Sequence, residues 1–257
     1  MKKRLRSFTV TSVVIGVALV LAGLVVVDSP AERAQIRAAD RVAARHQDAV
    51  KRFTTTTAAS IAGKKANSKK DLSALLSFVD ERLGAAPRIP TSGTTAFGRE
   101  HSRAYRTAAE RQKFALQPFR SLAAFLRDGA IPDLAYIAAG RKLVQVSPAK
   151  ILEGFQVFTG TPLRELVLPA FEKARDDLKK QDPPADSKLL GIDLETYADD
   201  VISMTKDGAD KLDRQTNFVF DFGARPDDLF RRLGIVETTI KSELSTRIDE
   251  LGSSSEA

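Results

Sequence analysis

A chain of 257 residues with a hydrophobic fraction of 43% is long enough to bury a core, and it is globular rather than disordered. It has no cysteine, which excludes disulfides, thiolate catalysis and cysteine-ligated metals. Four of the seven net positive charges precede residue 8, so the rest of the chain carries only three. Because no basic stripe with interleaved aromatics is visible, we expect a surface of mixed charge and no nucleic-acid partner.

The first element is an apolar stretch, Phe8 to Val27, with no charged residue. As a helix of about 20 residues it would span roughly 30 Å, the hydrocarbon thickness of a bilayer. The basic flank MKKRLR keeps residues 1–7 in the cytoplasm by the positive-inside rule and sends the rest of the chain across. The sequence thus predicts a cell-membrane protein with a single-pass signal-anchor helix over residues 8–28, whose partner is the lipid bilayer. A tail of about seven residues is too short for an output domain.

The alternative is a cleaved signal and a secreted protein. A cleavable signal has an apolar core of only about 7 to 15 residues, and the one plausible site here lies near Ala31, within Ser29-Pro30-Ala31. With Glu32, the same residues form a capping box, with a hydroxyl at the N-cap and proline at the first helical position. That signature begins a helix, so a retained anchor is favoured.

Two amphipathic helices follow. The first carries an apolar stripe from residue 36 to 53 and could continue through Thr54–Thr57 to about Ala62, where Gly63 ends it. Ser68 and Asp71 begin the second, which ends at Gly84. Its apolar face consists of Leu72, Leu75, Leu76, Val79 and Leu83. The segment after it, GAAPRIPTSGTTAFG, is an irregular loop that serves either as a linker or as a binding loop.

The rest of the chain is also predicted to be helical. A long segment runs from about Ala96 to Arg127, interrupted at Pro118 and closed by Asp128-Gly129. Shorter helices then open at the prolines of residues 131–132, 147–148 and 161–162, and Pro169 could kink the third. Two longer helices cover about residues 192–214 and the stretch after Pro226, and residues 252–257 form a disordered tail. Pro183-Pro184 marks a possible domain boundary within residues 182–191.

Two segments are candidates for partner or ligand contact. In NFVFDFG, three phenylalanines alternate, which predicts an extended connector that plugs the core, with a sheet strand or a ligand-facing aromatic patch as alternatives. These residues are Phe218, Phe220 and Phe222. The basic turn KKANSKK could contact anionic headgroups or wall polymers. Its lysines are Lys64, Lys65, Lys69 and Lys70.

The remaining polar residues suggest no catalytic constellation. Two Ser-x-x-Lys tetrads begin at Ser147 and Ser203, but the partner motifs of penicillin-recognising serine enzymes are missing, and Ser147 fits a helix N-cap. His46 and His101 are the only histidines, which excludes a multi-histidine metal centre. The densest acidic cluster is interleaved with basic residues and is interpreted as a solvated face with ion pairs. It comprises Asp193, Glu195, Asp199, Asp200, Asp207, Asp210 and Asp213.

The sequence therefore predicts an all-α protein: a single N-terminal transmembrane helix, then an antiparallel helical bundle over residues 29–251 on the extracytoplasmic side. We expect a non-enzymatic interaction or scaffolding protein with a protein partner and with no cofactor or metal. Two alternatives stay open: a hydrolase that uses paired carboxylates facing a cleft, and a small-ligand-binding domain with a pocket lined by the Phe218 to Phe222 rings.

Overall fold

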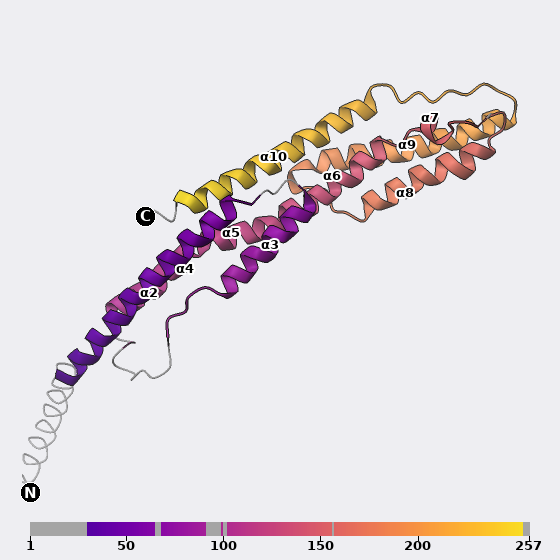
Figure 1. Ribbon diagram of the computed structural model, residues 1–257. Helices are drawn as coiled ribbons and strands as arrows, with labels where there is room; N and C mark the ends of the chain where they lie inside the picture. Colours follow the sequence, from indigo (N-terminus) through magenta and orange to yellow (C-terminus); the bar gives the residue numbers. More distant parts are fainter. Residues whose placement is uncertain (1–29, 65–67, 91–98, 100–101, 156, 254–257) are drawn as a thin grey trace, which may run out of the picture. The chain divides into compact units, whose positions relative to one another are not determined.

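The computed structural model describes residues 30–64, 68–90, 99, 102–155 and 157–253 (Figure 1). Within these ranges every regular element is a helix and no strand is present, which confirms the all-α class and the helical bundle. The predicted membrane span over residues 8–28 lies outside the described residues. No helix inside them combines the length and the apolar character needed to cross a bilayer.

The chain forms two compact units. Unit 1 consists of Met1–Ala58, Gly84–Gln117 and Ser254–Ala257, and unit 2 consists of Ala59–Leu83 and Pro118–Ser253. The proline-rich residues 182–191, a possible boundary by sequence, lie inside unit 2. The chain therefore passes between the units four times rather than once.

The first two helices form as their end signals predict. Helix α2 covers Pro30–Ala62 with Glu32 in its first turn, and it runs through the four threonines to the predicted end. Helix α3 covers Lys69–Gly84. Before it, the Asp71 N–H donates to Ser68 Oγ at 3.2 Å, and the Ser68 N–H donates to Asp71 Oδ2 at 3.1 Å. This reciprocal pair satisfies two amides that the helix itself leaves without acceptors.

The middle of the chain corrects the predicted helix boundaries. Helices α4 (Arg103–Ala115) and α5 (Gln117–Phe125) are separated only at Leu116, and the π-helical turn η1 (Leu126–Ala130) leads directly into α6 (Ile131–Val144). The prediction that Asp128-Gly129 ends a helix is wrong. Pro132 has no N–H and its ring would crowd the carbonyl four residues earlier, so the chain widens there. The Ile131 N–H instead donates to the Leu126 carbonyl, five residues back.

The same arrangement occurs before Pro169, where the π-helical turn η2 (Leu163–Val167) precedes α8 (Leu168–Lys179). The Leu168 N–H donates to the Leu163 carbonyl. The other elements of unit 2 are α7 (Pro148–Ile151), the 3-10 turn η3 (Ala185–Ser187), α9 (Lys188–Asp213) and α10 (Arg225–Ser253). Helix α10 thus includes residues 252 and 253 of the predicted tail, and residues 254–257 lie outside the described part.

The core of unit 2 is organised around α6, which packs against both α8 and α10, while α8 also packs against α9. Gly140 lets Leu194 of α9 and Leu233 of α10 pack closely against the α6 backbone. A Cβ at this position would lie only 3.1 to 3.2 Å from the methyl groups of these two leucines. Both leucines are fully buried. Burying several such side chains, at about 1.5 to 3 kcal/mol each, supplies the driving force for this packing.

Candidate functional site

The aromatic segment connects α9 to α10 and packs on helices of its own unit. Residues 216–222 form neither helix nor strand, and the three phenylalanine rings are half-buried. Phe218 sits where a Cβ on Gly208 would be, and its ring centroid lies 4.9 Å from that of Phe220. Phe222 meets Phe171 and Tyr197 edge-on at 6.2 and 6.4 Å. The rings therefore contact each other and helices α8 and α9.

The basic turn is described only in part. Lys65 lies outside the described residues, whereas Lys64, Lys69 and Lys70 are exposed in unit 2. The Lys64 ammonium lies 4.2 Å from the centre of the Phe78 ring, a cation–π contact. Lys69 borders two small open grooves, of about 320 and 260 Å³, beside α6. Nothing in these contacts selects a ligand.

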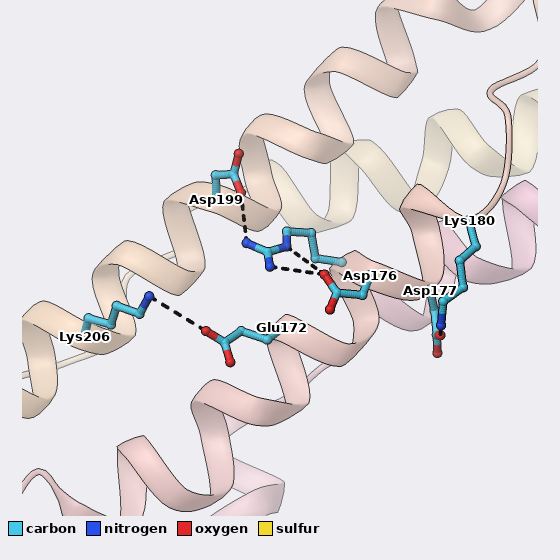
Figure 2. A network of polar contacts seen from close by, with 7 residues as sticks. Glu172, Asp176, Asp177, Lys180, Asp199 and Lys206 are labelled. Carbon is cyan, nitrogen blue, oxygen red and sulfur yellow. Dashed lines mark hydrogen bonds and ion pairs between the residues drawn. The ribbon is translucent and has the colours of Figure 1, made fainter.

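The acidic cluster of α9 is neutralised by neighbouring cations. Figure 2 shows Asp199 and Lys206 of α9 facing α8, where the Lys206 Nζ lies 3.7 Å from Glu172 Oε1. Six of the seven carboxylates in the acidic cluster form ion pairs. The pairs are Asp193 with Arg232, Asp199 with Arg175, Asp200 with Arg225, Asp207 with Lys211, and both Asp210 and Asp213 with Arg164.

The electrostatics of this cluster favour structure over acid–base chemistry. The Gly160 N–H and the Arg164 guanidinium both donate to Asp213 and hold the pKa of its carboxyl below the usual value. Glu195 is exposed, and no group of three potential metal ligands occurs in the described residues.

Two of the histidine and serine candidates, His46 and Ser147, make hydrogen bonds within unit 1 and unit 2 respectively. His46 is 6% exposed, and its Nε2 lies 3.0 Å from Oε1 of Gln112. His101 lies outside the described residues. Ser147 caps α7, accepting from the Lys150 N–H at 3.4 Å, as its N-cap interpretation predicts. Ser203 is exposed, and the lysine of its tetrad is the Lys206 already paired with Glu172.

A feature that the overall charge conceals lies in unit 1. Residues 30–58 and 84–117 hold 12 lysines and arginines against 5 aspartates and glutamates, a net charge of +7. Residues 59–83 and 118–253 hold 24 against 26, a net charge of −2. The net charge of the residues after Val27 led us to expect a surface of evenly mixed charge. The charge is instead uneven, because the positive excess is concentrated in the smaller unit.

Four arginines with regular spacing on α2, which we call the arginine ladder, contribute much of the excess positive charge. Arg33, Arg37, Arg41 and Arg45 recur every four residues and are exposed. Residues four apart lie on neighbouring turns of one helix face, so their like charges repel in the isolated helix. The Arg37 Nε donates to the Arg33 carbonyl at 3.2 Å, and the Arg41 Nε donates to the Arg37 carbonyl at 3.4 Å. Within the described residues, Arg37, Arg41 and Arg45 have no carboxylate partner.

Helix α4 lies beside α2 and runs in the same direction. Ser102 contacts Asp40, and Arg111 contacts Gln47, so both contacts advance together along the two helices. This pair is parallel, unlike the antiparallel neighbours that the sequence predicts.

Ser102 fixes the start of α4. As the N-cap, its hydroxyl oxygen accepts a hydrogen bond from the Tyr105 N–H at 3.1 Å. The same hydroxyl donates to Asp40 Oδ1 at 2.6 Å, and Ser102 is fully buried. Further along, Gln112 links three segments: its side-chain amide donates to the Pro87 carbonyl, and its oxygen faces His46. These contacts determine where the arginines of α4 lie relative to those of α2.

Between the parallel helices runs an open groove of about 670 Å³. It is lined by Ile36, Asp40 and Gln47 of α2 and by Arg103, Ala104, Thr107 and Arg111 of α4. Arg103 makes no hydrogen bond or ion pair within the described residues, and Arg111 makes one long hydrogen bond, 3.4 Å, to Gln47. Two arginines, one carboxylate and several uncharged side chains thus line this groove, which we call the α2–α4 groove.

Sequence reasoning missed this groove, although one signal was present. The four-residue spacing of the α2 arginines is visible in the sequence, but summing the charge after residue 27 hid it. The partnership of α2 with α4 was not readable, because Ser102 lacks the glutamate three residues later that completes a capping box. No family model, curated protein or solved structure matches the chain.

Replacing Ser102 by alanine is expected to lower the free energy of unfolding by about 1 to 3 kcal/mol, because it removes an N-cap and leaves Asp40 without its donor. Urea denaturation monitored by circular dichroism measures this. Ser77→Ala is the matched control: Ser77 is exposed and donates only to the Ser73 carbonyl within its own helix. Equal losses in the two variants would contradict the assigned role of Ser102.

Proposed function

We propose that this chain is a membrane-tethered, extracytoplasmic interaction protein, held by residues 8–27 and non-enzymatic, whose unit 1 binds a protein partner. The observation that carries the proposal is the α2–α4 groove, where arginines without carboxylate partners flank small apolar side chains. An Arg guanidinium in such a place is available for carboxylates of another molecule.

The contrast with unit 2 supports an interaction role for the unit 1 cations. In unit 2 most arginines are bound to carboxylates, for example Arg127 to Asp80 at 2.8 Å and Arg141 to Glu237 at 2.6 Å. In unit 1, carboxylates are too few to neutralise the arginines, and Asp40 is already engaged by Ser102. Uncompensated like charges on one unit are costly for folding, so their retention favours a use in binding.

The tether is supported by the sequence of residues 8–27 and by the start of α2 at Pro30. A helix that begins three residues after the apolar stretch leaves no room for an extended cleavage loop at Ser29-Pro30-Ala31. The arginine ladder would then begin close to the membrane surface, and the partner would be met on the extracytoplasmic side.

Membrane fractionation of the full chain tests the tether. We expect the wild-type chain to stay in the membrane pellet after alkaline extraction with residues 1–28 retained by intact mass, because its apolar stretch is long enough to span. Leu19→Arg combined with Val20→Arg should move it to the soluble fraction, since arginine at the centre of a span strongly opposes insertion. Leu189→Arg combined with Val219→Arg, the same two changes at exposed positions outside the stretch, should leave membrane retention unchanged.

Sidedness can be read in the same cells. Because the chain has no cysteine, Ser73→Cys introduces a single exposed thiol on α3. A membrane-impermeant maleimide added to intact cells should label it. A mature chain that begins near Glu32 and is soluble, or a thiol that reacts only after lysis, would overturn the proposed tether or its orientation.

A further inference from the structure

The α2–α4 groove has the dimensions of a helix-binding site. The lining runs from Ile36 to Gln47 on α2 and from Arg103 to Arg111 on α4, rises of 11 and 8 residues, or about 16 and 12 Å at 1.5 Å per residue. Two parallel helices present matched ridges, and a third helix of about three turns can pack into the groove between them. A flat lipid surface would not fill such a concave site.

The face of α4 that lines the groove carries arginines and ends in an exposed aromatic side chain. Arg103, Thr107, Arg111 and Phe114 lie at steps of four, four and three, and so share one face of α4. Phe114 is 76% exposed, an aromatic side chain left in solvent at the end of this line. An exposed aromatic beside arginines is the residue combination that is enriched at the energetic centres of protein interfaces.

The groove also selects the charge of its occupant. Arg103 and Arg111 of α4 line the groove, and the one carboxylate in its lining, that of Asp40, already accepts the Ser102 hydroxyl. Ile36 and Ala104 offer no hydrogen-bonding side chain. An occupant that fits this lining therefore combines apolar residues with carboxylates. A polyanion without apolar side chains would satisfy only the two arginines.

We infer that the α2–α4 groove binds an acidic amphipathic helix of a partner protein, with apolar side chains of that helix against Ile36, Ala104 and Phe114 and its carboxylates on Arg103 and Arg111. The inference rests on the proposed function, because it names the partner of the same unit. Recognition of this kind uses apolar anchors spaced by three and four residues on the bound helix. Arginine adds paired, planar hydrogen bonds to carboxylates.

Site-specific photo-crosslinking in the full chain tests the inference. Benzoylphenylalanine replaces Thr107 in the groove or Thr239, an exposed threonine of α10, as the control. Illumination of living cells should give a protein adduct from position 107 and none from position 239. Mass spectrometry of the adduct should identify a partner peptide that is rich in Asp and Glu and carries apolar residues at helical spacing.

Charge reversal completes the test. Arg103→Glu with Arg111→Glu should lower the adduct yield at least tenfold, whereas Lys150→Glu with Lys188→Glu, an equal change in charge on exposed lysines of unit 2, should leave it within twofold. Unchanged thermal unfolding of both variants shows that they fold. Replacing the partner's acidic residues by arginine should restore crosslinking to the first variant.

The possible failures can be told apart. An adduct whose yield ignores Arg103→Glu with Arg111→Glu, or whose partner peptide has no acidic excess, overturns the acidic helix while a protein partner remains. An adduct to lipid, a nuclease-sensitive adduct or no adduct at position 107 also overturns it. The tether is judged separately by fractionation, so a soluble chain that still crosslinks as expected would refute only the tether.

Discussion

Replacing Gly160 by alanine should lower the free energy of unfolding by about 3 kcal/mol or more, a large effect for one methyl group. A Cβ at this position would lie 2.3 Å from the carbonyl oxygen of Ala209 and 2.7 and 2.8 Å from its carbonyl carbon and Cα. These are backbone atoms of α9, which cannot rotate away as a side chain can. The segment before η2 would have to leave the helix.

That displacement would also break a polar link. The Gly160 N–H donates to Asp213 Oδ1 at 2.7 Å, and Arg164 donates to the other carboxylate oxygen at 2.6 Å. Gly160 therefore sets the distance at which η2 and the end of α9 are held together. Loss of the contact removes close packing and this hydrogen bond at the same time.

The matched control is Gly234→Ala in α10, where the nearest atom to a new Cβ is Arg141 Nη2 at 3.8 Å. Alanine is the better helix former, so this variant should gain about 0.5 to 1 kcal/mol. Urea denaturation of the full chain in detergent measures both. Similar stabilities for the two variants would show that the close contact with Ala209 does not constrain the fold.

The helix ends that were predictable are the ones with local hydrogen-bonding signals. Ser68 and Asp71 satisfy each other's amides within four residues, so the sequence contains the whole motif. Ser147 before Pro148 is equally local. Such ends depend on few distant residues, which is why they can be read from the chain alone.

The prolines show where local reading fails. Pro132 and Pro169 were expected to open or kink helices, because proline lacks the amide that continues an α-helix. In the structure each follows a five-residue π-helical turn, and the helix continues. Packing of α6 and α8 in the core of unit 2 stabilises that continuity, and such distant contacts leave no trace near the proline.

The candidate site was hidden for a related reason. The arginine spacing on α2 is local, but the groove requires α4 to lie parallel to α2, which depends on Ser102 reaching Asp40 across 62 residues. The phenylalanine segment was predicted from its alternation as an extended connector that plugs the core; residues 216–222 form neither helix nor strand, and the three rings are half-buried. What the alternation could not predict is that Gly208 leaves the space that Phe218 fills.

Raising the pH from 10 to 12 should destabilise the protein, and Tyr136 should account for a large share. Tyr136 is 2% exposed, and burial, with a smaller contribution from the charge of Glu195, raises its pKa to about 12. Burial likewise raises the pKa of Tyr197 to about 12, although nearby Arg225 opposes the rise. Between pH 10 and 12 the native state keeps protons that the unfolded chain has lost.

Stability is therefore fully present below pH 10 and falls as the pH rises through this window. A shift of two pKa units corresponds to about 3 kcal/mol for each tyrosine. The Tyr136 hydroxyl also has no hydrogen-bond partner within the described residues. Tyr136→Phe should thus gain about 1 kcal/mol at neutral pH, because it removes an unsatisfied buried donor, and should lose roughly half of the alkaline destabilisation.

Tyr105→Phe is the control, since the Tyr105 hydroxyl donates to the Pro90 carbonyl at 2.7 Å. It should lose about 1 kcal/mol at neutral pH, because it removes a hydrogen bond. Urea midpoints measured at intervals across pH 7 to 12 distinguish the two variants. If Tyr136→Phe is less stable than the wild-type chain at pH 7, the hydroxyl has a partner; if its alkaline decrease is undiminished, Tyr136 does not titrate with unfolding. Either result would contradict the prediction that the buried Tyr136 hydroxyl lowers the free energy of unfolding.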